Sequence, residues 1–239
     1  MLLEQFKSKK QYYDYHDKLS STIWDDFKLK PEILTGLRKI ADKFIETLGV
    51  ESGSVSDIQF VGSLCNYNYT KFSDIDLHVI LEYDEICEDC KKFSLDDCMK
   101  AKKSLWNEQH EITVYGYDVE LYVQDTSEGH VSAGTFSIKD NKWVTKPKKE
   151  VVKFDHKTIK QKAKAFMYEI DEVIDSEGND IDDIDRLIEK IKKMRKSGLE
   201  KHGEMGLENL VFKVLRNSGY IEKLYDYKTE VEDNSLSIE

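Results

Sequence analysis

Apolar residues recur every three or four positions in a long stretch near the start of the chain. Pro31 stands where the first turn of a helix would begin, and Gly49 stands where that helix would end. Proline favours the first turn of a helix and glycine its C-terminal cap. The pattern therefore predicts an amphipathic helix between these two residues. The apolar positions that share the helical spacing are Ile33, Leu34, Leu37, Ile40, Ala41, Phe44, Ile45 and Leu48.

The period of the pattern changes to two in the next part of the chain. Short apolar runs at residues 58–63 and 74–81 predict two strands, with a polar, turn-like segment between them. Residues 111–125 alternate apolar and polar positions. This length suits one long strand or a hairpin bent near Gly116. The middle of the chain therefore predicts a small sheet.

Helical spacing returns at residues 94–109 and again after residue 150. The later predicted helices cover residues 156–175, 181–197 and 204–227. Short strands with flanking helices indicate an α+β fold, with a small mixed or antiparallel sheet, an N-terminal helix and a C-terminal helical domain. The expected parts are an N-terminal helical segment at residues 1–50, a sheet core at 51–150, and a helical domain with a flexible tail at 151–239.

Composition and charge narrow the classes of function. The chain has 239 residues, of which 39% are hydrophobic, and a formal net charge of −11. This acidic balance argues against a broad surface coated with nucleic acid, although it leaves room for a local basic groove. No stretch approaches the roughly 18 apolar residues that span a bilayer, and the first residues lack the apolar centre of a secretory signal. We expect a soluble, cytoplasmic protein without a membrane partner.

Lysine dominates residues 139–164, and acids dominate residues 165–185. A basic run of this kind either steers RNA or an NTP towards a site, or forms a solvated face that balances the acids after it. We favour the solvated face.

Three of the four cysteines fall in one short segment. Cys87, Cys90 and Cys98, with His110 as a fourth ligand, raise the alternative of a zinc site. The spacing is irregular, and the acidic neighbours of these thiols disfavour the thiolate that zinc requires. We therefore interpret them as ordinary reduced cysteines.

Two aspartates stand two positions apart at the start of an apolar run. Asp74 and Asp76 belong to the predicted strand at residues 74–81, so both carboxylates project from the same face. Two like charges side by side are costly to bury unless a cation neutralises them. Carboxylate oxygens suit hard divalent ions such as Mg²⁺, which also bind triphosphate oxygens. The pair predicts a site for Mg²⁺ or Mn²⁺.

A Gly-Ser pair precedes this strand, and an acidic strand follows it. Gly62 lets the backbone approach a phosphate closely, and Ser63 adds a hydroxyl donor. In the later strand, Asp118 and Glu120 share the face opposite the apolar residues. We favour Glu120 as a third metal ligand, because it lies mid-strand between apolar neighbours and Asp118 lies closer to the bend at Gly116.

The polar segment between the two motifs holds candidates for contacts with a nucleotide. Ser73 directly precedes Asp74 and is a candidate for a triphosphate contact. Lys71 is suited to meet a phosphate and Tyr69 to stack on a base, although both residue types are also common in turns. His78 shares the face of the aspartates, where a histidine bonded to a neighbouring side chain is the commoner arrangement.

These elements together resemble the DNA polymerase β-like nucleotidyltransferases. The resemblance consists of Gly-Ser, ten residues, Asp-x-Asp in an apolar strand, and then an acid in a later strand, and it covers residues 57–125. It implies that Gly62 and Ser63 hold a triphosphate and that two metal ions bind with the NTP. The metal ligands that it implies are Asp74, Asp76 and Glu120. The superfamily often has Asp at the third position, where this chain has Glu.

The resemblance implies an enzyme that moves a nucleoside monophosphate from an NTP, ATP among them, to an acceptor hydroxyl and releases pyrophosphate. The acceptor stays open between an RNA or tRNA 3′ end, a second nucleotide, a small molecule and a protein hydroxyl. The predicted C-terminal helices favour RNA ends, whereas the acidic net charge favours a small acceptor. The alternative is a nucleotide-binding or interaction protein that keeps the fold with weakened chemistry, and the intact Gly-Ser and Asp-x-Asp motifs argue against it.

Overall fold

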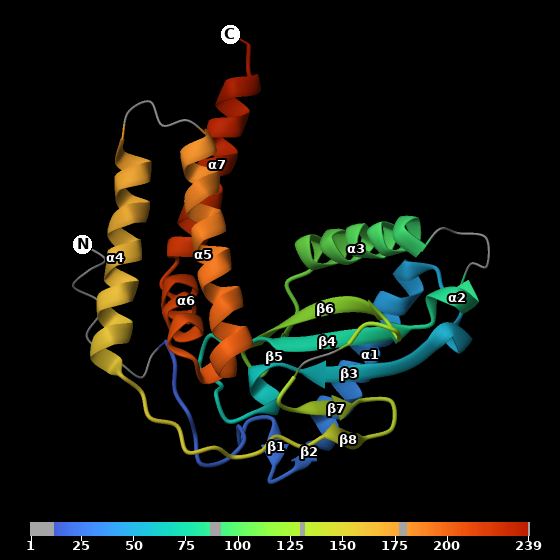
Figure 1. Cartoon of the computed structure of the whole chain (residues 1–239). Coiled ribbons are helices and arrows are strands. Elements are labelled where there is room, and N and C mark those ends of the chain that lie inside the picture. Colours follow the sequence, from blue (N-terminus) through green and yellow to red (C-terminus); the bar gives the residue numbers. More distant parts are fainter. Residues whose placement is uncertain (1–11, 87–91, 130–131, 177–180, 239) are drawn as a thin grey trace. The chain divides into compact units, whose positions relative to one another are not determined.

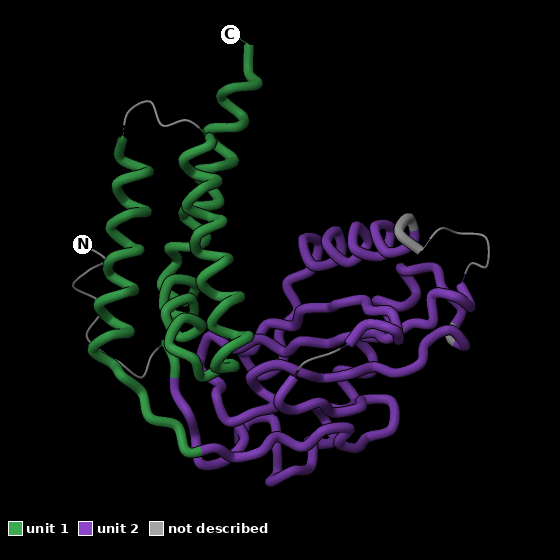
Figure 2. Tube along the Cα trace, in the orientation of Figure 1, with its two compact units in different colours: residues 1–13, 151–239 green, residues 14–150 purple. Residues whose placement is uncertain are grey.

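The structure is a computed structural model, and it describes residues 12–86, 92–129, 132–176 and 181–238 (Figure 1). The chain divides into two compact units (Figure 2). Residues 14–150 form the first, which we call the sheet unit. Residues 1–13 and 151–239 form the second, which we call the helical unit.

A six-stranded mixed sheet forms the centre of the sheet unit, in the order β5-β6-β4-β3-β7-β8. Its strands are β3 (Val55–Val61), β4 (Ile75–Leu81), β5 (Thr113–Val114), β6 (Tyr117–Asp125), β7 (Thr135–Ser137) and β8 (Lys142–Thr145). Strands β4 and β6 run parallel, and the other neighbours run antiparallel. A separate antiparallel pair joins β1 (Trp24–Asp25) to β2 (Lys28–Leu29). The predicted α+β class is confirmed.

Helix α1 (Pro31–Leu48) packs its apolar side into the core of the sheet unit. Pro31 lies in its first turn, and Gly49 ends it with a φ of 70°, as the pattern predicted. Helix α3 (Lys92–Gln109) joins the same core, since the rings of Phe44 and Trp106 lie 5.4 Å apart in an edge-on arrangement. The short helix α2 (Tyr83–Ile86) precedes it. The buried side chains of α1 are Ile33, Leu37, Ala41, Phe44, Ile45 and Leu48.

Strands β5 and β6 form a hairpin, which is one of the two arrangements that the sequence left open. Tyr115 and Gly116 form its turn with φ values of 52° and 84°. Two central residues with positive φ match the twist of a tight hairpin. Beyond the residues that pair with β5, the side-chain amide of Asn107 forms hydrogen bonds with the backbone of β6. It donates to the oxygen of Leu121 at 3.0 Å and accepts from its N–H at 3.1 Å.

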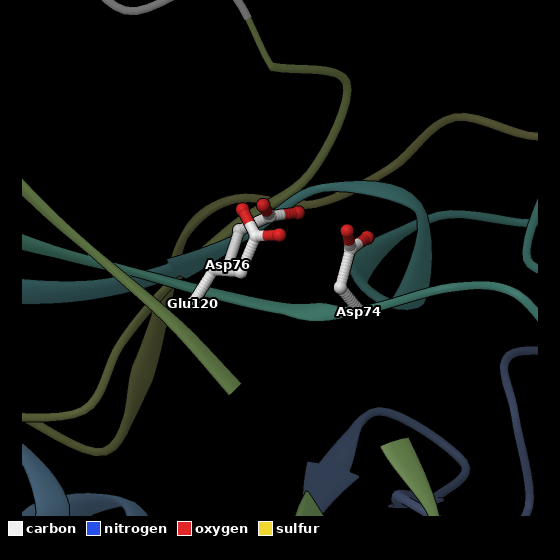
Figure 3. Close-up of side chains that lie close together, drawn as sticks. All are labelled: Asp74, Asp76 and Glu120. Carbon is white, nitrogen blue, oxygen red and sulfur yellow. The ribbon is translucent and has the colours of Figure 1, made fainter. Parts of the chain in front are cut away.

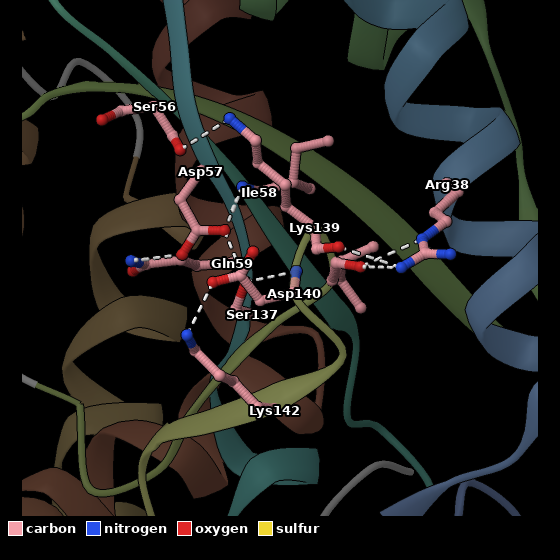
Figure 4. A network of polar contacts seen from close by, with 10 residues as sticks. Arg38, Ser56, Asp57, Ile58, Gln59, Ser137, Lys139, Asp140 and Lys142 are labelled. Carbon is pink, nitrogen blue, oxygen red and sulfur yellow. Dashed lines mark hydrogen bonds and ion pairs between the residues drawn. The ribbon is translucent and has the colours of Figure 1, made fainter.

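Strands β7 and β8 were not predicted, and polar contacts hold their hairpin to β3 (Figure 4). The buried hydroxyl of Ser137 donates to Asp57 at 2.6 Å. Lys139 donates to a main-chain oxygen of β3 at 2.8 Å. Arg38 of α1 donates to the oxygen of Ile138 at 3.0 and 2.9 Å. Strands β7 and β8 have only three and four residues. Hydrophobic alternation did not reveal these strands, because they are so short and are held by polar contacts.

The helical unit consists of α4 (His156–Asp175), α5 (Ile181–His202), α6 (Leu207–Asn217) and α7 (Tyr220–Leu236). The prediction of one helix at residues 204–227 is wrong. The chain breaks at Gly219, whose φ of 80° is left-handed, and a residue in that conformation interrupts a helix. No helix in the described part of the chain is long and apolar enough to cross a membrane.

Candidate metal-binding site

Three carboxylates converge where β4 and β6 begin (Figure 3). Asp74 directly precedes β4, and Asp76 lies within it. Glu120 of β6 is the direct partner of Asp76 in the parallel pairing of the two strands. One carboxylate oxygen from each of the three side chains lies within 4.8 Å of the others, and all three residues are half-buried. The structure therefore brings together the three acids that the sequence singled out.

Asp118, the competing acid of the same strand, lies outside this group. It is exposed and pairs with Thr113 of β5, two residues nearer the hairpin turn than Glu120. Parity along the strand could not separate these two acids, because both face the same way. The register of β6 against β4 does separate them, since it sets Glu120 beside Asp76.

Gly62 fits a place that no other residue could occupy without displacement. Its φ is 81°, in the region that favours glycine. A Cβ atom there would lie 2.0 Å from a carboxylate oxygen of Asp76. The backbone at the end of β3 therefore passes directly against the acid group. The approach of Gly62 to a phosphate stays a prediction.

Ser63 and Ser73 meet beside the acids. Their hydroxyl oxygens lie 2.7 Å apart, and that of Ser73 accepts from the N–H of Thr70 at 2.9 Å. Ser63 begins a short 3-10 turn (Ser63–Cys65), which is contacted by the buried indole of Trp24. That indole donates to the oxygen of Leu64 at 2.7 Å. Two hydroxyl groups from separate segments are thus fixed next to the predicted metal ligands.

Tyr69 and Lys71 contact other side chains of the sheet unit. The ring of Tyr69 stacks on that of His16 with centroids 3.9 Å apart, and burial raises the pKa of its hydroxyl. The exposed Lys71 places its ammonium group 4.6 Å from the centroid of the Phe72 ring. The roles of these two residues in nucleotide binding stay predictions.

Tyr122 is a residue of this site for which the sequence had suggested no role. Its hydroxyl donates to the carboxylate of Glu120, and its ring stacks on His78 with centroids 4.7 Å apart. The ammonium group of Lys103, from α3, lies 4.5 Å from the centroid of the Tyr122 ring. The period-two alternation that places Glu120 on this face also places Tyr122 there, and that was the available signal.

The pKa of Tyr122 is raised above its ordinary value. Burial is the largest cause, followed by the hydrogen bond to Glu120 and by the negative charges of Glu120, Asp76 and Asp74. Tyr122 is therefore a neutral donor near pH 7, which suits it to orient one carboxylate of the acid group. His78 contacts Gln124 at 3.1 Å through Nδ1, in agreement with the neighbour-bonded arrangement that we favoured for it.

The cysteine alternative falls largely outside the described residues, because Cys87 and Cys90 do. Cys98 is a free, exposed thiol, and Nδ1 of His110 contacts the main-chain oxygen of Trp106 at 3.0 Å. Cys65 is fully buried, and burial raises the pKa of its thiol well above the ordinary value, with a smaller effect from the charge of Asp76. Cys65 is accordingly a neutral thiol, which donates to the main-chain oxygen of Phe60 at 3.2 Å.

No protein-family model matches the chain, and no curated protein sequence matches it. Among solved structures, the chain is similar to a STING-associated CdnE c-di-GMP synthase from Capnocytophaga granulosa. The two share 13% identity, the match covers 90% of this chain and 88% of that chain, and the TM-score is 0.24. A likeness at this level carries no argument about function, so the site is interpreted from its own geometry.

Proposed function

We propose that this chain is a metal-dependent nucleotidyltransferase, which transfers a nucleoside monophosphate from an NTP to an acceptor hydroxyl and releases pyrophosphate. The observation that carries the proposal is the acid group itself. Asp74, Asp76 and Glu120 come from two adjacent strands, and their carboxylate oxygens lie within 4.8 Å of one another. The Gly-Ser turn against this group supports it.

The donor set fits a hard divalent cation. All three side chains offer carboxylate oxygens, which are the ligands that Mg²⁺ and Mn²⁺ take. Like charges this close disfavour one another's ionised form, and a divalent cation relieves that repulsion. When bound, such ions neutralise charge on the phosphate oxygens and promote loss of the proton from the attacking hydroxyl.

The chain's own residues then bind and orient the substrates. The acceptor oxygen forms a bond to the α-phosphorus, the bond from that phosphorus to the leaving pyrophosphate breaks, and the hydroxyl proton is released. We assign the triphosphate to the backbone of Gly62 and to the hydroxyls of Ser63 and Ser73. Lys71 is assigned to a phosphate and Tyr69 to the base.

Labelled nucleotides test this proposal. With Mg²⁺ or Mn²⁺, label from an [α-³²P]NTP should enter a product, while label from the matching [γ-³²P]NTP should appear only in pyrophosphate. Asp76→Asn should lose the transfer, and Asp118→Asn, which removes an exposed acid from the same strand face, should keep it. Transfer of the γ label would contradict the proposal. Tight NTP binding without transfer of either label would favour the alternative of a nucleotide-binding protein with weakened chemistry.

A further inference from the structure

A hollow of the sheet unit, with a volume of about 970 Å³, is lined in part by residues of β1, β2 and β8. These three strands are labelled in Figure 1. Aromatic side chains form part of its lining. These are Trp24, Phe27, Phe136 and Trp143. We call this hollow the aromatic pocket. None of its lining residues is one of the three acids.

The aromatic rings brace one another into a fixed platform. Trp24 is buried and stacks on Trp143 with centroids 4.6 Å apart. Phe136 meets the Trp143 ring edge-on at 5.3 Å. Trp143 also donates its indole N–H to the oxygen of Phe27 at 2.7 Å. Phe27 itself is 39% exposed, so its ring brings the platform to the surface. The hydrogen bond from Trp143 holds the backbone of Phe27 in place.

Positive charge surrounds this platform. The lysines of the lining are Lys28, Lys30, Lys142 and Lys146, and its acids are Asp25 and Glu32. The ammonium group of Lys146 lies 5.3 Å from the centroid of the Phe27 ring. The pocket is therefore locally basic in a chain whose formal net charge is −11. Two of these lysines belong to the lysine-rich run at residues 139–164, for which the sequence favoured a solvated face.

The platform is also joined to the Gly-Ser turn. The buried indole of Trp24 donates to the oxygen of Leu64 at 2.7 Å, and Leu64 lies in the 3-10 turn that Ser63 begins. A ligand on the aromatic platform would therefore lie within the same unit as the acid group, one buried side chain away from the turn assigned to the triphosphate.

We propose that the aromatic pocket binds a single-stranded nucleic acid. The exposed ring of Phe27 would stack on a base while lysine ammonium groups meet the phosphates. This combination gives sequence-tolerant binding of single-stranded nucleic acids. Lys142 already pairs with Asp140 at 2.8 Å. A phosphate backbone complements the other three lysines, which an uncharged apolar partner would not do. One further step rests on the proposed function, namely that the bound nucleic acid supplies the acceptor hydroxyl to which the nucleoside monophosphate is transferred.

Fluorescence anisotropy with labelled single-stranded oligonucleotides tests the binding, without NTP so that no reaction is involved. The variant Lys28→Ala/Lys146→Ala should bind at least about tenfold more weakly and lower the salt slope by about two. Its matched control is Lys43→Ala/Lys100→Ala, which removes two exposed lysines of α1 and α3. The control variant should bind the oligonucleotide with an affinity within about twofold of wild type, because salt screens the attraction between distant surface lysines and the phosphates of the oligonucleotide.

The aromatic contribution has its own variant. Phe27→Ala should weaken binding by about five- to a hundredfold, as expected for the loss of one stacked base. Circular dichroism checks that this variant is folded. RNA and DNA oligonucleotides are measured in parallel, and a preference for either single strand over a duplex supports the proposal. Equal binding to duplex, wild-type affinity in Phe27→Ala, or equal losses in the two lysine variants would overturn it.

This experiment separates the inference from the proposed function. If the wild type transfers α label to a small acceptor and binds no oligonucleotide, the inference fails and the proposed function stands. If oligonucleotides bind through the aromatic pocket and no α label is transferred, the proposed function fails and the binding site stands.

Discussion

Two groups of charged residues, one in each unit, differ in how their charges are arranged. In the helical unit, lysines and acids from different helices pair at the surface. The pairs are Lys190–Glu169 at 2.6 Å, Lys223–Asp171 and Lys228–Asp185 at 2.7 Å, and Lys162–Glu208 at 3.2 Å. In the acid group of the sheet unit, oxygens of three carboxylates lie within 4.8 Å of one another. Exposed ion pairs contribute little to stability and require no ligand, whereas gathered like charges cost stability until a cation joins them.

The same contrast appears around two tyrosines. In the helical unit, Tyr220 donates to Asp171 at 3.2 Å, and Lys223 contacts the same carboxylate at 2.7 Å. In the sheet unit, Tyr122 donates to Glu120, which lies among further acids. The first arrangement is neutralised by the protein itself. The second gathers three carboxylates within 4.8 Å of one another, which is why we assign the chemistry to the sheet unit.

The largest expected effect is that of Asp76→Asn. Transfer should fall by at least about a thousandfold, because a charged ligand worth several kcal/mol of transition-state stabilisation is lost. Without divalent cations, the thermal unfolding temperature should stay level or rise, since repulsion among the acids is relieved. Asp185→Asn is the control from the helical unit, where that acid pairs with Lys228, and it should leave transfer unchanged. Near-normal turnover of Asp76→Asn would contradict the two-strand carboxylate mechanism.

A second comparison lies within β6. Glu120→Gln should slow transfer by at least about a hundredfold, while Asp118→Asn should slow it less than about tenfold, with rates measured across Mg²⁺ concentrations. Both substitutions are nearly isosteric and each removes one negative charge. The two variants therefore differ in the position at which that charge is lost. The reverse order would show that the site uses Asp118, two residues nearer the hairpin turn.

Two glycines with nearly equal positive φ but different ψ, −165° at Gly62 and 3° at Gly219, sharpen the comparison between units. Gly62 and Gly219 have φ values of 81° and 80°, but a Cβ at Gly62 would meet Asp76 at 2.0 Å and one at Gly219 would meet nothing within 4 Å. Alanine should cost about 1–2 kcal/mol of unfolding free energy at Gly219 through backbone strain alone. At Gly62, clash and strain should together cost more.

Transfer should distinguish these two variants further. Gly62→Ala should reduce transfer by at least about tenfold because it displaces Asp76, which we assign to the metal site, and misplaced catalytic groups typically have effects of this size. Gly219→Ala should keep it. Urea unfolding and α-label transfer measure the two effects, and equal transfer by both variants would show that the approach of Gly62 to Asp76 has no functional role.

The smallest effect is expected from Tyr220 and is confined to alkaline pH. Burial, the charge of Asp171 and the hydrogen bond to it raise the pKa of Tyr220 from 10.0 to about 12. In the unfolded chain the hydroxyl of Tyr220 ionises near pH 10, and in the folded chain it ionises near pH 12. The contribution of the neutral hydroxyl to the free energy of unfolding is therefore complete below pH 10 and is lost as the pH rises towards 12. The absorbance difference at 295 nm between wild type and Tyr220→Phe should titrate near pH 12. A midpoint near 10 would contradict the buried hydrogen bond.

Local patterns in the sequence predicted the elements whose rules are local. Pro31 and Gly49 bound α1 as predicted, because caps depend on single residues. The alternation in β6 put Glu120 on one face and Leu121 in the core. The acids of the site were found for the same reason, since residues two apart in a strand share a face.

The features that the sequence missed depend on contacts between distant residues. The β7–β8 hairpin is held by Ser137 against Asp57, a contact without a periodic signal. The break at Gly219 was missed because apolar spacing continues through it. The register that chooses Glu120 over Asp118 is a property of the β4–β6 pairing, and the anchoring of Trp24 to Leu64 spans 40 residues.

Binding of Mn²⁺ followed by electron paramagnetic resonance tests the central claim most directly, because it measures the acid group without requiring an acceptor. Wild-type protein with a non-hydrolysable NTP should bind Mn²⁺, Asp76→Asn and Glu120→Gln should each weaken that binding by at least about tenfold, and Asp185→Asn in the helical unit should not change it. Equal Mn²⁺ affinity in wild type and in Asp76→Asn would contradict the assignment of these carboxylates as a metal site.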